Sequence, residues 1–149
     1  MSVLSPSLNV FVVVAQFYPD ISDLQFKSVE SFFEKHDFKI DKVTVPGCFE
    51  IPGAISIAST SKTKNYDMYI ALGCLIKGET SHYDLISTAV TNALMDLTIN
   101  KSLPLGFGIL TCNNQEQAKK RASSSAENAV KAALSIFKFQ EKLLKESNL

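Results

Sequence analysis

The stretch "LGCLIKGETSHYD" at Leu72–Asp84 passes from apolar residues into a short polar turn, and it decides the fold. Upstream, the run "YDMYIAL" at Tyr66–Leu72 is aromatic and aliphatic, as expected of a strand buried within a sheet. Downstream, Asp84–Asn100 has the spacing of apolar residues that is typical of a covering helix. A buried strand, a short turn and a helix in this order form the repeating unit of an α/β fold.

The N-terminal half of the chain repeats this unit. The β-branched run "VFVVVA" at Val10–Ala15 predicts a central strand, and apolar residues at helical spacing predict a helix over Ile21–Lys35. The segment "FKIDKVTV" at Phe38–Val45 alternates apolar and polar residues, which is typical of an edge strand. A second helix is expected over Phe49–Thr60.

The C-terminal part adds a last strand and a last helix. The run "PLGFGIL" at Pro104–Leu110 predicts the strand, and a helical pattern covers Gln115–Lys145 with an expected bend near the serines at 123–125. Because short strands alternate with longer helices, the crossovers should be right-handed and the strands parallel. The sequence therefore predicts an α/β fold, a three-layer αβα sandwich with a central four-stranded parallel sheet.

Length and charge limit the organisation and the partners of the chain. Its 149 residues are 46% hydrophobic, enough for one core, so a single domain over residues 1–149 is expected. The 15 Lys and Arg residues balance the 15 Asp and Glu residues, which leaves no broad positive field for nucleic acid or an anionic membrane. Small molecules and protein subunits are therefore the expected partners.

The cysteines and the N-terminus indicate the compartment. Cys48, Cys74 and Cys112 are odd in number, far apart and surrounded by apolar residues, so we predict free thiols rather than disulfide bonds or a zinc site. The N-terminus lacks the features of a signal peptide, and no run approaches the roughly 18 apolar residues of a membrane span. We expect a soluble cytoplasmic protein.

Polar residues follow each predicted strand at its carboxyl end, which is where open parallel sheets bind ligands. Four segments meet this condition: Gln16–Tyr18, Pro46–Glu50, Cys74–His82 and Thr111–Asn114. All four should lie along one edge of the sheet. This edge is the expected functional site.

The turn at Gly78–His82 suits a phosphate group. It precedes a helix, whose first N–H groups attract anions, and Thr80 and Ser81 add hydroxyl donors. The sequence equally allows Thr80 or Ser81 to cap the helix, with Glu79 near its positive end. The turn has neither a GxxxxGK[ST] nor a GxGxxG motif, so nucleotide phosphates are not indicated.

Several side chains near this edge have two interpretations each. His82 could move protons near neutral pH, although a lone histidine is more often a structural polar residue. Lys77 could bind phosphate, form an imine or simply be exposed, and Cys74 could be a nucleophile or a packing residue. Arg121 could reach the phosphate, or it could be one exposed member of a basic cluster with Lys119 and Lys120.

Two aromatic rings and a carboxylate complete the candidates. Phe17 and Phe107 lie near strand ends and could stack on a planar heterocycle or pack inside the protein. Glu50 could bind a polyol or cap a helix. None of these interpretations is decided by the residue alone.

Three segments in order carry a resemblance over nearly the whole chain: "VPGCFEIP" (Val45–Pro52), "ALGCLIKGETSHYD" (Ala71–Asp84) and "PLGFGILTCNNQEQAKKRA" (Pro104–Ala122). Together they resemble the 6,7-dimethyl-8-ribityllumazine synthases, the family that performs the penultimate step of riboflavin biosynthesis. The resemblance implies a flavodoxin-like fold and a transferase. The implied reaction condenses 5-amino-6-(D-ribitylamino)uracil with 3,4-dihydroxy-2-butanone 4-phosphate, giving the lumazine, phosphate and water without a cofactor or metal.

The resemblance also implies roles for individual residues. The residues implied to bind the pyrimidine and the ribityl chain are Phe17, Cys48, Phe49, Glu50, Cys74, Leu75, Ile76 and Phe107. The residues implied to bind the phosphate are Gly78, Glu79, Thr80 and Arg121, while His82 would transfer protons. A homo-oligomer is implied as well, a pentamer or twelve pentamers, in which Phe107 completes the site of an adjacent subunit.

The chain departs from the family pattern at two places. Gln16–Tyr18 stands where the family has an arginine, an aromatic residue and an asparagine, and residues 126–130 stand where the family has a sequence similar to "AGNKG". The lysine of that signature is missing, and Arg121, Lys120 or Lys131 could compensate for it. These departures leave an alternative, a noncatalytic flavin- or lumazine-binding assembly protein of the same fold. A flavodoxin-like cofactor or signalling domain is a weaker alternative, because it gives "GETSHYD" no role.

Overall fold

The computed structural model of the chain describes residues 7–34, 36–78 and 82–147. Along this part of the chain the order of elements is β1 (Leu8–Ala15), α1 (Pro19–Phe33), β2 (Phe38–Val45), the 3-10 turn η1 (Cys48–Glu50), α2 (Ile51–Ser59), β3 (Met68–Ile76), α3 (Tyr83–Asn100), β4 (Leu105–Cys112) and α4 (Gln115–Ser147). The predicted alternation of strands and helices is confirmed.

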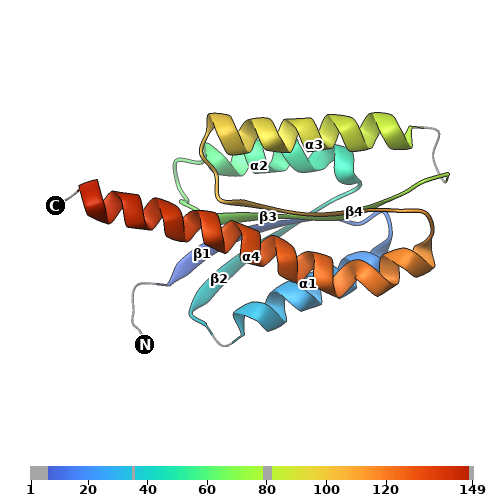
Figure 1. Ribbon diagram of the computed structural model, residues 1–149, viewed down its shortest axis with the longest axis horizontal. Helices are drawn as coiled ribbons and strands as arrows, with labels where there is room; N and C mark the ends of the chain where they lie inside the picture. Colours follow the sequence, from blue (N-terminus) through green and yellow to red (C-terminus); the bar gives the residue numbers. More distant parts are fainter. Residues whose placement is uncertain (1–6, 35, 79–81, 148–149) are drawn as a thin grey trace.

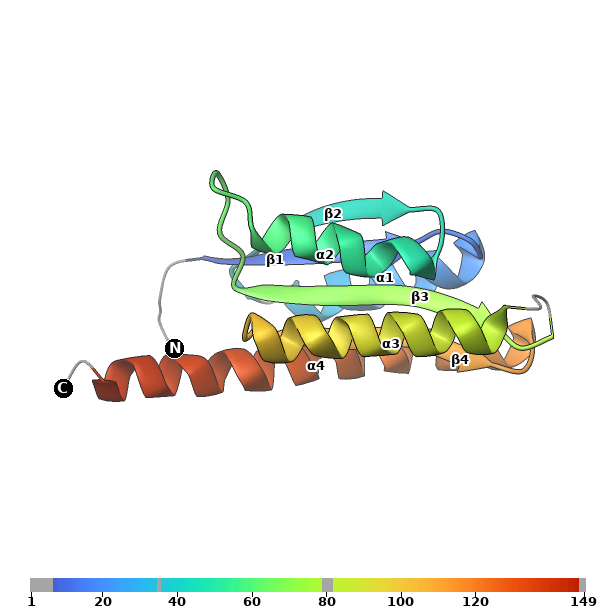
Figure 2. The ribbon, with the colours of Figure 1, turned by 90° about the horizontal axis from the view of Figure 1, so that it is seen from above.

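The strands form one parallel sheet in the order β2-β1-β3-β4. Helices α2 and α3 cover one face of this sheet, and α1 and α4 cover the other (Figures 1 and 2). β1 and β3 are interior strands, as their apolar runs predicted, and β2 is an edge strand, as its alternation predicted. The predicted three-layer α/β sandwich is therefore confirmed.

β3 is longer than the sequence predicted. The prediction ended this strand at Leu72, but β3 continues to Ile76, and β4 likewise continues to Cys112 rather than ending at Leu110. β3 pairs with β4 as far as Ile76 and Cys112, whereas its last pairing with β1 is at Leu72. The residues Gly73–Ile76 therefore continue past the last pairing with β1, and we call them the β3 overhang.

α4 is one continuous helix, and the bend expected near the serines at 123–125 does not interrupt it. Ser124 Oγ donates a hydrogen bond to Arg121 O at 3.3 Å, and Ser125 Oγ donates one to Ala122 O at 2.9 Å. The hydroxyls are thus satisfied by carbonyls of the same helix, so these serines do not end it. Among the described residues, no helix is both long enough and apolar enough to cross a membrane.

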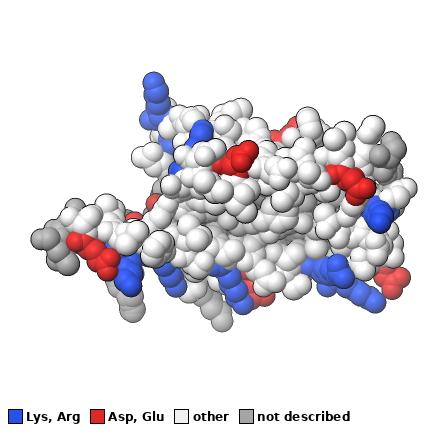
Figure 3. All heavy atoms as spheres, turned by 45° about the horizontal axis from the view of Figure 1, so that its top comes forward, with Lys and Arg blue, Asp and Glu red and all other residues white. Residues whose placement is uncertain are grey.

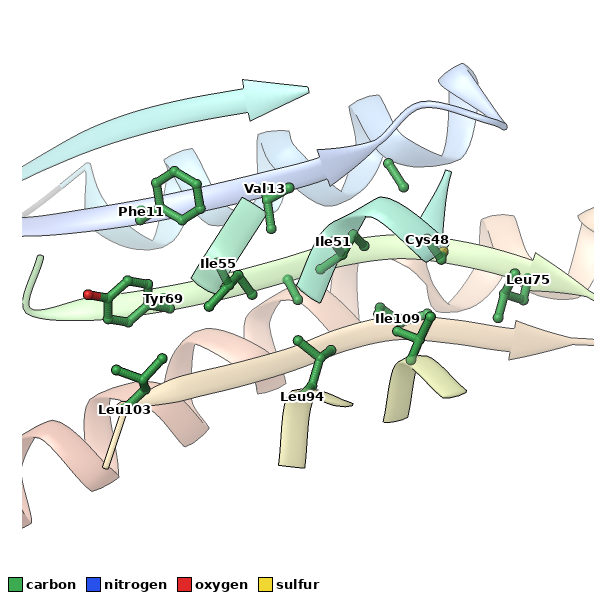
Figure 4. Packing of buried hydrophobic residues seen from close by; sticks show 13 residues of the cluster. Phe11, Val13, Cys48, Ile51, Ile55, Tyr69, Leu75, Leu94, Leu103 and Ile109 are labelled. Carbon is green, nitrogen blue, oxygen red and sulfur yellow. The ribbon is translucent and has the colours of Figure 1, made fainter. Parts of the chain in front are cut away.

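Apolar side chains fill the space on both faces of the sheet. On the face covered by α2 and α3, the buried cluster includes Phe11, Ile51, Leu94 and Ile109 (Figure 4). On the opposite face, valines of β1 pack with residues of β3, with α1 and with the alanines of α4. The interior strands are therefore buried from both sides, which accounts for their continuous apolar sequences.

Glycines in β4 allow α4 to lie directly against the sheet. A Cβ atom on Gly106 would overlap the main chain of Ala129 in α4. A Cβ atom on Gly108 would lie 2.8 Å from Leu72 Cδ2 and 2.9 Å from Ala71 O of β3, and 3.2 Å from Ala129 Cβ of α4. These two glycines match no nucleotide fingerprint, and the structure gives them a packing role instead.

Gly106→Ala should lower the free energy of unfolding by about 1–3 kcal/mol, because the added methyl group must push α4 away from β4. Gly53→Ala in α2 is the matched control, since a Cβ atom there meets nothing within 4 Å and alanine favours a helix by up to about 1 kcal/mol. Urea unfolding followed by circular dichroism measures both variants. Equal stability of Gly106→Ala and the wild type would contradict the close approach of α4.

Candidate active site

A pocket of about 130 Å³ opens at the carboxyl ends of the strands, beside the β3 overhang. Its wall combines the loop after β1, the loop and η1 after β2, the end of β3 and the first turn of α3. Its lining residues are Phe17, Tyr18, Gly47, Cys48, Phe49, Cys74, Leu75, Ile76 and Ile86. The wall is apolar and partly aromatic, and none of these residues carries a formal charge.

Most of the residues expected to bind the pyrimidine and the ribityl chain meet in this pocket: Phe17, Cys48, Phe49, Cys74, Leu75 and Ile76. The sequence predicted the meeting from the rule that ligands bind at the carboxyl ends of parallel strands. It was wrong about the backbone of the last three, which it placed in a loop and which belong to β3. Thr111, also expected in a loop, belongs to β4.

The floor of the pocket is the β3 overhang. Leu75 packs in the cluster under α2 and α3, whereas Cys74 and Ile76 pack with alanines of α4. This alternation is the one that a strand requires. Because the pairing with β1 stops at Leu72, the overhang borders the pocket on that side. Strand main chain therefore lies next to an otherwise apolar cavity.

Phe17 and Phe49 lie at the mouth of the pocket. Their surfaces are 69% and 64% exposed, although both residues line the cavity. The ring of Phe17 meets that of Tyr18 edge to face, with the ring centroids 4.9 Å apart. An exposed ring held by a second ring is suited to stacking on a planar heterocycle.

Cys48 forms part of the wall, and its thiol is buried. Its Sγ lies 3.9 Å from Cys74 O, and a Cβ atom on Gly73 would lie 2.7 Å from this sulfur. Burial raises the pKa of Cys48 to about 12, so the thiol stays protonated and uncharged near neutral pH. Cys48 therefore shapes the pocket and is not a thiolate nucleophile.

Glu50 closes the η1 turn. Its Oε1 accepts a hydrogen bond from the Gly47 N–H at 3.0 Å, and the residue is exposed. Of the two interpretations of Glu50, the capping role is the one present in this structure. Its binding of a polyol stays a prediction.

The structure describes the two ends of the expected phosphate-binding turn, Gly78 and His82. Gly78 has a φ of 88°, a left-handed conformation that glycine adopts readily. Glu79 and Thr80 lie outside the described residues. His82 is exposed and occupies the N-cap position of α3, so this helix begins later than a cap at Thr80 or Ser81 would place it.

Arg121 is exposed on the second turn of α4. The next residue, Ala122, is fully buried and packs with Ile76 and Cys112, the last residues of β3 and β4. This turn of α4 therefore lies at the same end of the sheet as the pocket.

The two lysines that could compensate for the missing family lysine are already paired. Lys120 Nζ lies 3.4 Å from Glu116 Oε1, and Lys131 Nζ lies 3.4 Å from Glu127 Oε1. Within the described ranges, the guanidinium of Arg121 takes part in no ion pair. Arg121 is thus the better candidate of the three for an anionic ligand.

Phe107 does not line the pocket of its own chain. It lies in the edge strand β4, on the face covered by α2 and α3, and 43% of its surface is exposed. The sequence expected this ring to complete the site of an adjacent subunit, and that role stays a prediction.

Three residues of the pocket had no assigned role in the sequence: Tyr18, Gly47 and Ile86. Tyr18 and Gly47 lie in two of the four segments expected at this edge, but neither was given a role of its own. Ile86 lies one helical turn after His82, a spacing that places both near the start of α3. That spacing is the signal in the sequence that could have identified Ile86.

Comparison with known proteins decides the family. The family model for 6,7-dimethyl-8-ribityllumazine synthase matches residues 7–141. The chain belongs to this family. Proteins named 6,7-dimethyl-8-ribityllumazine synthase from Bartonella tribocorum and Bartonella henselae are each 43% identical to it, covering 90% and 91% of this chain and 91% and 90% of their own. One from Agrobacterium fabrum is 39% identical, covering 91% of this chain and 96% of its own.

In this member of the lumazine synthase family, all three cysteines are free and buried, which gives a test of the pocket wall. Near pH 8 the native thiols should react with a thiol-directed disulfide reagent at least about 100-fold more slowly than those of the unfolded chain, because only an exposed thiolate reacts quickly. The urea-unfolded protein is the control, and all three of its thiols should react. One fast-reacting thiol in the native protein would contradict the burial described here.

Proposed function

We propose that this chain condenses 5-amino-6-(D-ribitylamino)uracil with 3,4-dihydroxy-2-butanone 4-phosphate, giving 6,7-dimethyl-8-ribityllumazine, phosphate and water in riboflavin biosynthesis. The match to the family and to relatives named as the synthase over about nine-tenths of the chain supports the proposal. The observation that carries it is the pocket, which gathers most of the expected substrate-binding residues at one end of the sheet. The protein is then a transferase of the cytoplasm.

The pyrimidine ring occupies the apolar pocket in this proposal. Phe17 stacks on the face of the ring, and Leu75 with Cys48 limits how deeply it enters. The main chain of the β3 overhang lies where it can meet the polar edge of the ring. The ribityl chain extends past Phe49 and Glu50, where polar groups face solvent.

The phosphorylated substrate binds at the rim, beside the start of α3. The N–H groups around Gly78 and the first turn of α3 attract its phosphate, and Glu79 and Thr80 complete this segment. Arg121 supplies a guanidinium, which holds a phosphate through charge-assisted hydrogen bonds. His82 is the N-cap residue of α3. It follows this segment in the sequence and precedes the pocket residue Ile86 by one helical turn.

The reaction needs both the pocket, which holds the pyrimidine, and the rim, which holds the phosphate. The amine of the pyrimidine attacks the ketone and forms an imine with loss of water, phosphate then leaves by elimination, and ring closure with a further loss of water gives the lumazine. His82 transfers protons in these steps, and Arg121 stabilises the charge that develops on the departing phosphate.

Positioning contributes more to the rate than the proton transfers do. A general acid–base group contributes about 10²–10⁴-fold. Holding two reactants in reactive geometry contributes up to roughly 7–11 kcal/mol in ideal cases, which is several orders of magnitude more. The strand floor of the pocket serves this positioning, because strands move less than loops.

A second copy of the chain completes the site. The pocket of about 130 Å³ is smaller than the roughly 300–1,000 Å³ of typical small-molecule sites. Phe107 is exposed on the edge strand β4, where a neighbouring copy can reach it. The expected assembly is a pentamer or twelve pentamers, and a native mass equal to one chain would contradict this part of the proposal.

The layer formed by α2 and α3 has the character of a subunit interface. α2 has no charged residue and α3 has two, and Figure 3 shows few charged side chains across this side. Exposed aliphatic side chains on it include Ile57, Leu85, Met95 and Ile99. An open groove of about 390 Å³ runs between the two helices. Aliphatic surface of this kind favours burial against another subunit.

Purified protein mixed with both substrates should form the lumazine faster than the uncatalysed mixture, followed by the absorbance of the product. The noncatalytic alternative predicts that the protein binds the lumazine without accelerating its formation. That result would contradict the proposed function.

Two substitutions separate the roles of the rim residues. Arg121→Ala should raise the KM for the phosphorylated substrate by about 10–100-fold, because it removes a charge-assisted hydrogen bond worth about 1.5–3 kcal/mol. His82→Ala should lower kcat by about 10²-fold, the low end for an acid–base group, because substrate positioning is retained. Lys120→Ala is the matched control, since this lysine is paired with Glu116. Unchanged kinetics of Arg121→Ala would remove its assigned role.

A further inference from the structure

Gln25 is an unusual residue for the interior of this protein. It lies in the middle of α1 and has none of its surface exposed. Its Nε2 donates hydrogen bonds to Gly108 O at 2.7 Å and to Gly73 O at 3.3 Å, and it lies 3.4 Å from Ser125 Oγ. One side chain of α1 thus joins β3, β4 and α4.

The orientation of the Gln25 amide is fixed by its partners. Two of them are carbonyl oxygens, which accept hydrogen bonds and cannot donate them. The NH₂ group must therefore face the sheet, and the Oε1 atom points away from these carbonyls. This Oε1 is buried and has no hydrogen-bond partner among the described residues.

The unpartnered oxygen makes Gln25 a costly choice for stability alone. A buried acceptor without a partner destabilises the folded state, whereas an apolar side chain of similar size at such a position carries no such cost. The other residues that α1 buries are the apolar Ile21, Val29 and Phe33, and Ser22, whose hydroxyl is hydrogen-bonded to main-chain carbonyls. The hydrogen bonds of Gln25 therefore need an explanation beyond core packing.

The partners of Gln25 connect it to the pocket. Gly73 is the first residue of the β3 overhang, where pairing with β1 has ended. On the other side of Gly73, Cys48 of η1 packs so closely that a Cβ atom would lie 2.7 Å from its sulfur. Gln25 therefore holds from one face of the sheet the same residue on which the pocket wall rests from the other face.

We infer that Gln25 is a positioning residue for the pyrimidine substrate, an inference that rests on the proposed function. It fixes the β3 overhang relative to η1 and so sets the depth and width of the pocket. Gly108 O takes the shortest of its hydrogen bonds, which anchors the amide to the neighbouring strand β4. Gln25 itself touches no substrate, and it acts through Gly73 and the residues that follow it.

Gln25→Leu tests the inference, because leucine fills the space and removes both the hydrogen bonds and the unpartnered oxygen. The KM for the pyrimidine substrate should rise about 3–10-fold, the effect of losing a hydrogen bond of ordinary strength, while the KM for the phosphorylated substrate stays within twofold. The urea midpoint should change little, because removal of the unpartnered oxygen offsets the loss of the hydrogen bonds to the two carbonyls. A fall in the midpoint with both KM values unchanged would assign Gln25 to the core alone and overturn the inference.

Val29→Ala is the matched control on the same helix. Val29 is fully buried one turn further along α1 and packs in the cluster with Val10 and Val12. It should lower the urea midpoint and leave both KM values unchanged. An equal rise in the pyrimidine KM for this variant would mean that any loss of stability loosens the pocket, and it would overturn the specific role of Gln25.

Gln25→Met is the second variant, since methionine matches the length of glutamine and adapts to irregular space. It should reproduce the selective rise in the pyrimidine KM. Failure of both the leucine and the methionine variants to fold would overturn the inference in favour of a folding role. Turnover by the wild type with no change in the variants overturns only the role of Gln25, whereas absence of turnover in the wild type overturns the proposed function and this inference with it.

Discussion

The unequal length of two neighbouring strands is the constraint on which the site depends. β3 continues for four residues after its last pairing with β1, and it is held there by β4 alone among the strands. The β3 overhang would be an exposed strand edge if nothing covered it. Instead η1 and the loop after β1 close over it, and the space between them is the pocket. The candidate site thus lies where the sheet is incomplete.

Glycines, which have no side chain, allow the close packing that keeps the overhang in position. Gly73 accepts η1 on one face, and Gly106 and Gly108 accept α4 on the other. A methyl group at Gly73 would displace Cys48, and one at Gly106 would displace α4. The amide of Gln25 adds a polar connection between β3 and β4 at the same level. Steric fit and one buried side chain therefore determine the shape of the pocket floor.

The site separates apolar from charged chemistry. The pocket is lined by uncharged residues, and burial keeps the Cys48 thiol neutral, so the floor suits a flat heterocycle. The basic residue Arg121, at the same end of the sheet, and the N-cap residue His82 are exposed to solvent instead. An anionic group can remain partly hydrated there, which avoids the large cost of burying a charge. This arrangement matches a reaction between a planar amine and a phosphorylated ketone.

Much of the fold followed from the sequence, because the apolar runs of β1 and β3 and the alternation of β2 report directly how each strand is buried. The rule for parallel sheets also brought Phe17, Cys48 and Phe49 to one edge before their contacts were known. The end of β3 could not be predicted, since it depends on pairing with β4, which is distant in sequence.

No local pattern in the sequence indicated a role for Gln25. Its role depends on carbonyls of two strands that meet only in the folded chain, and its own neighbours in α1 resemble those of any surface helix. Local sequence patterns do not predict the contacts that one side chain makes with three other elements.

A crystal structure of the protein with bound 6,7-dimethyl-8-ribityllumazine tests the central claim most directly. The account predicts that the ring lies on the β3 overhang against Phe17, with Phe107 of a neighbouring copy closing the site. Density for the ring in the groove between α2 and α3, with the pocket beside the overhang left without it, would contradict the account.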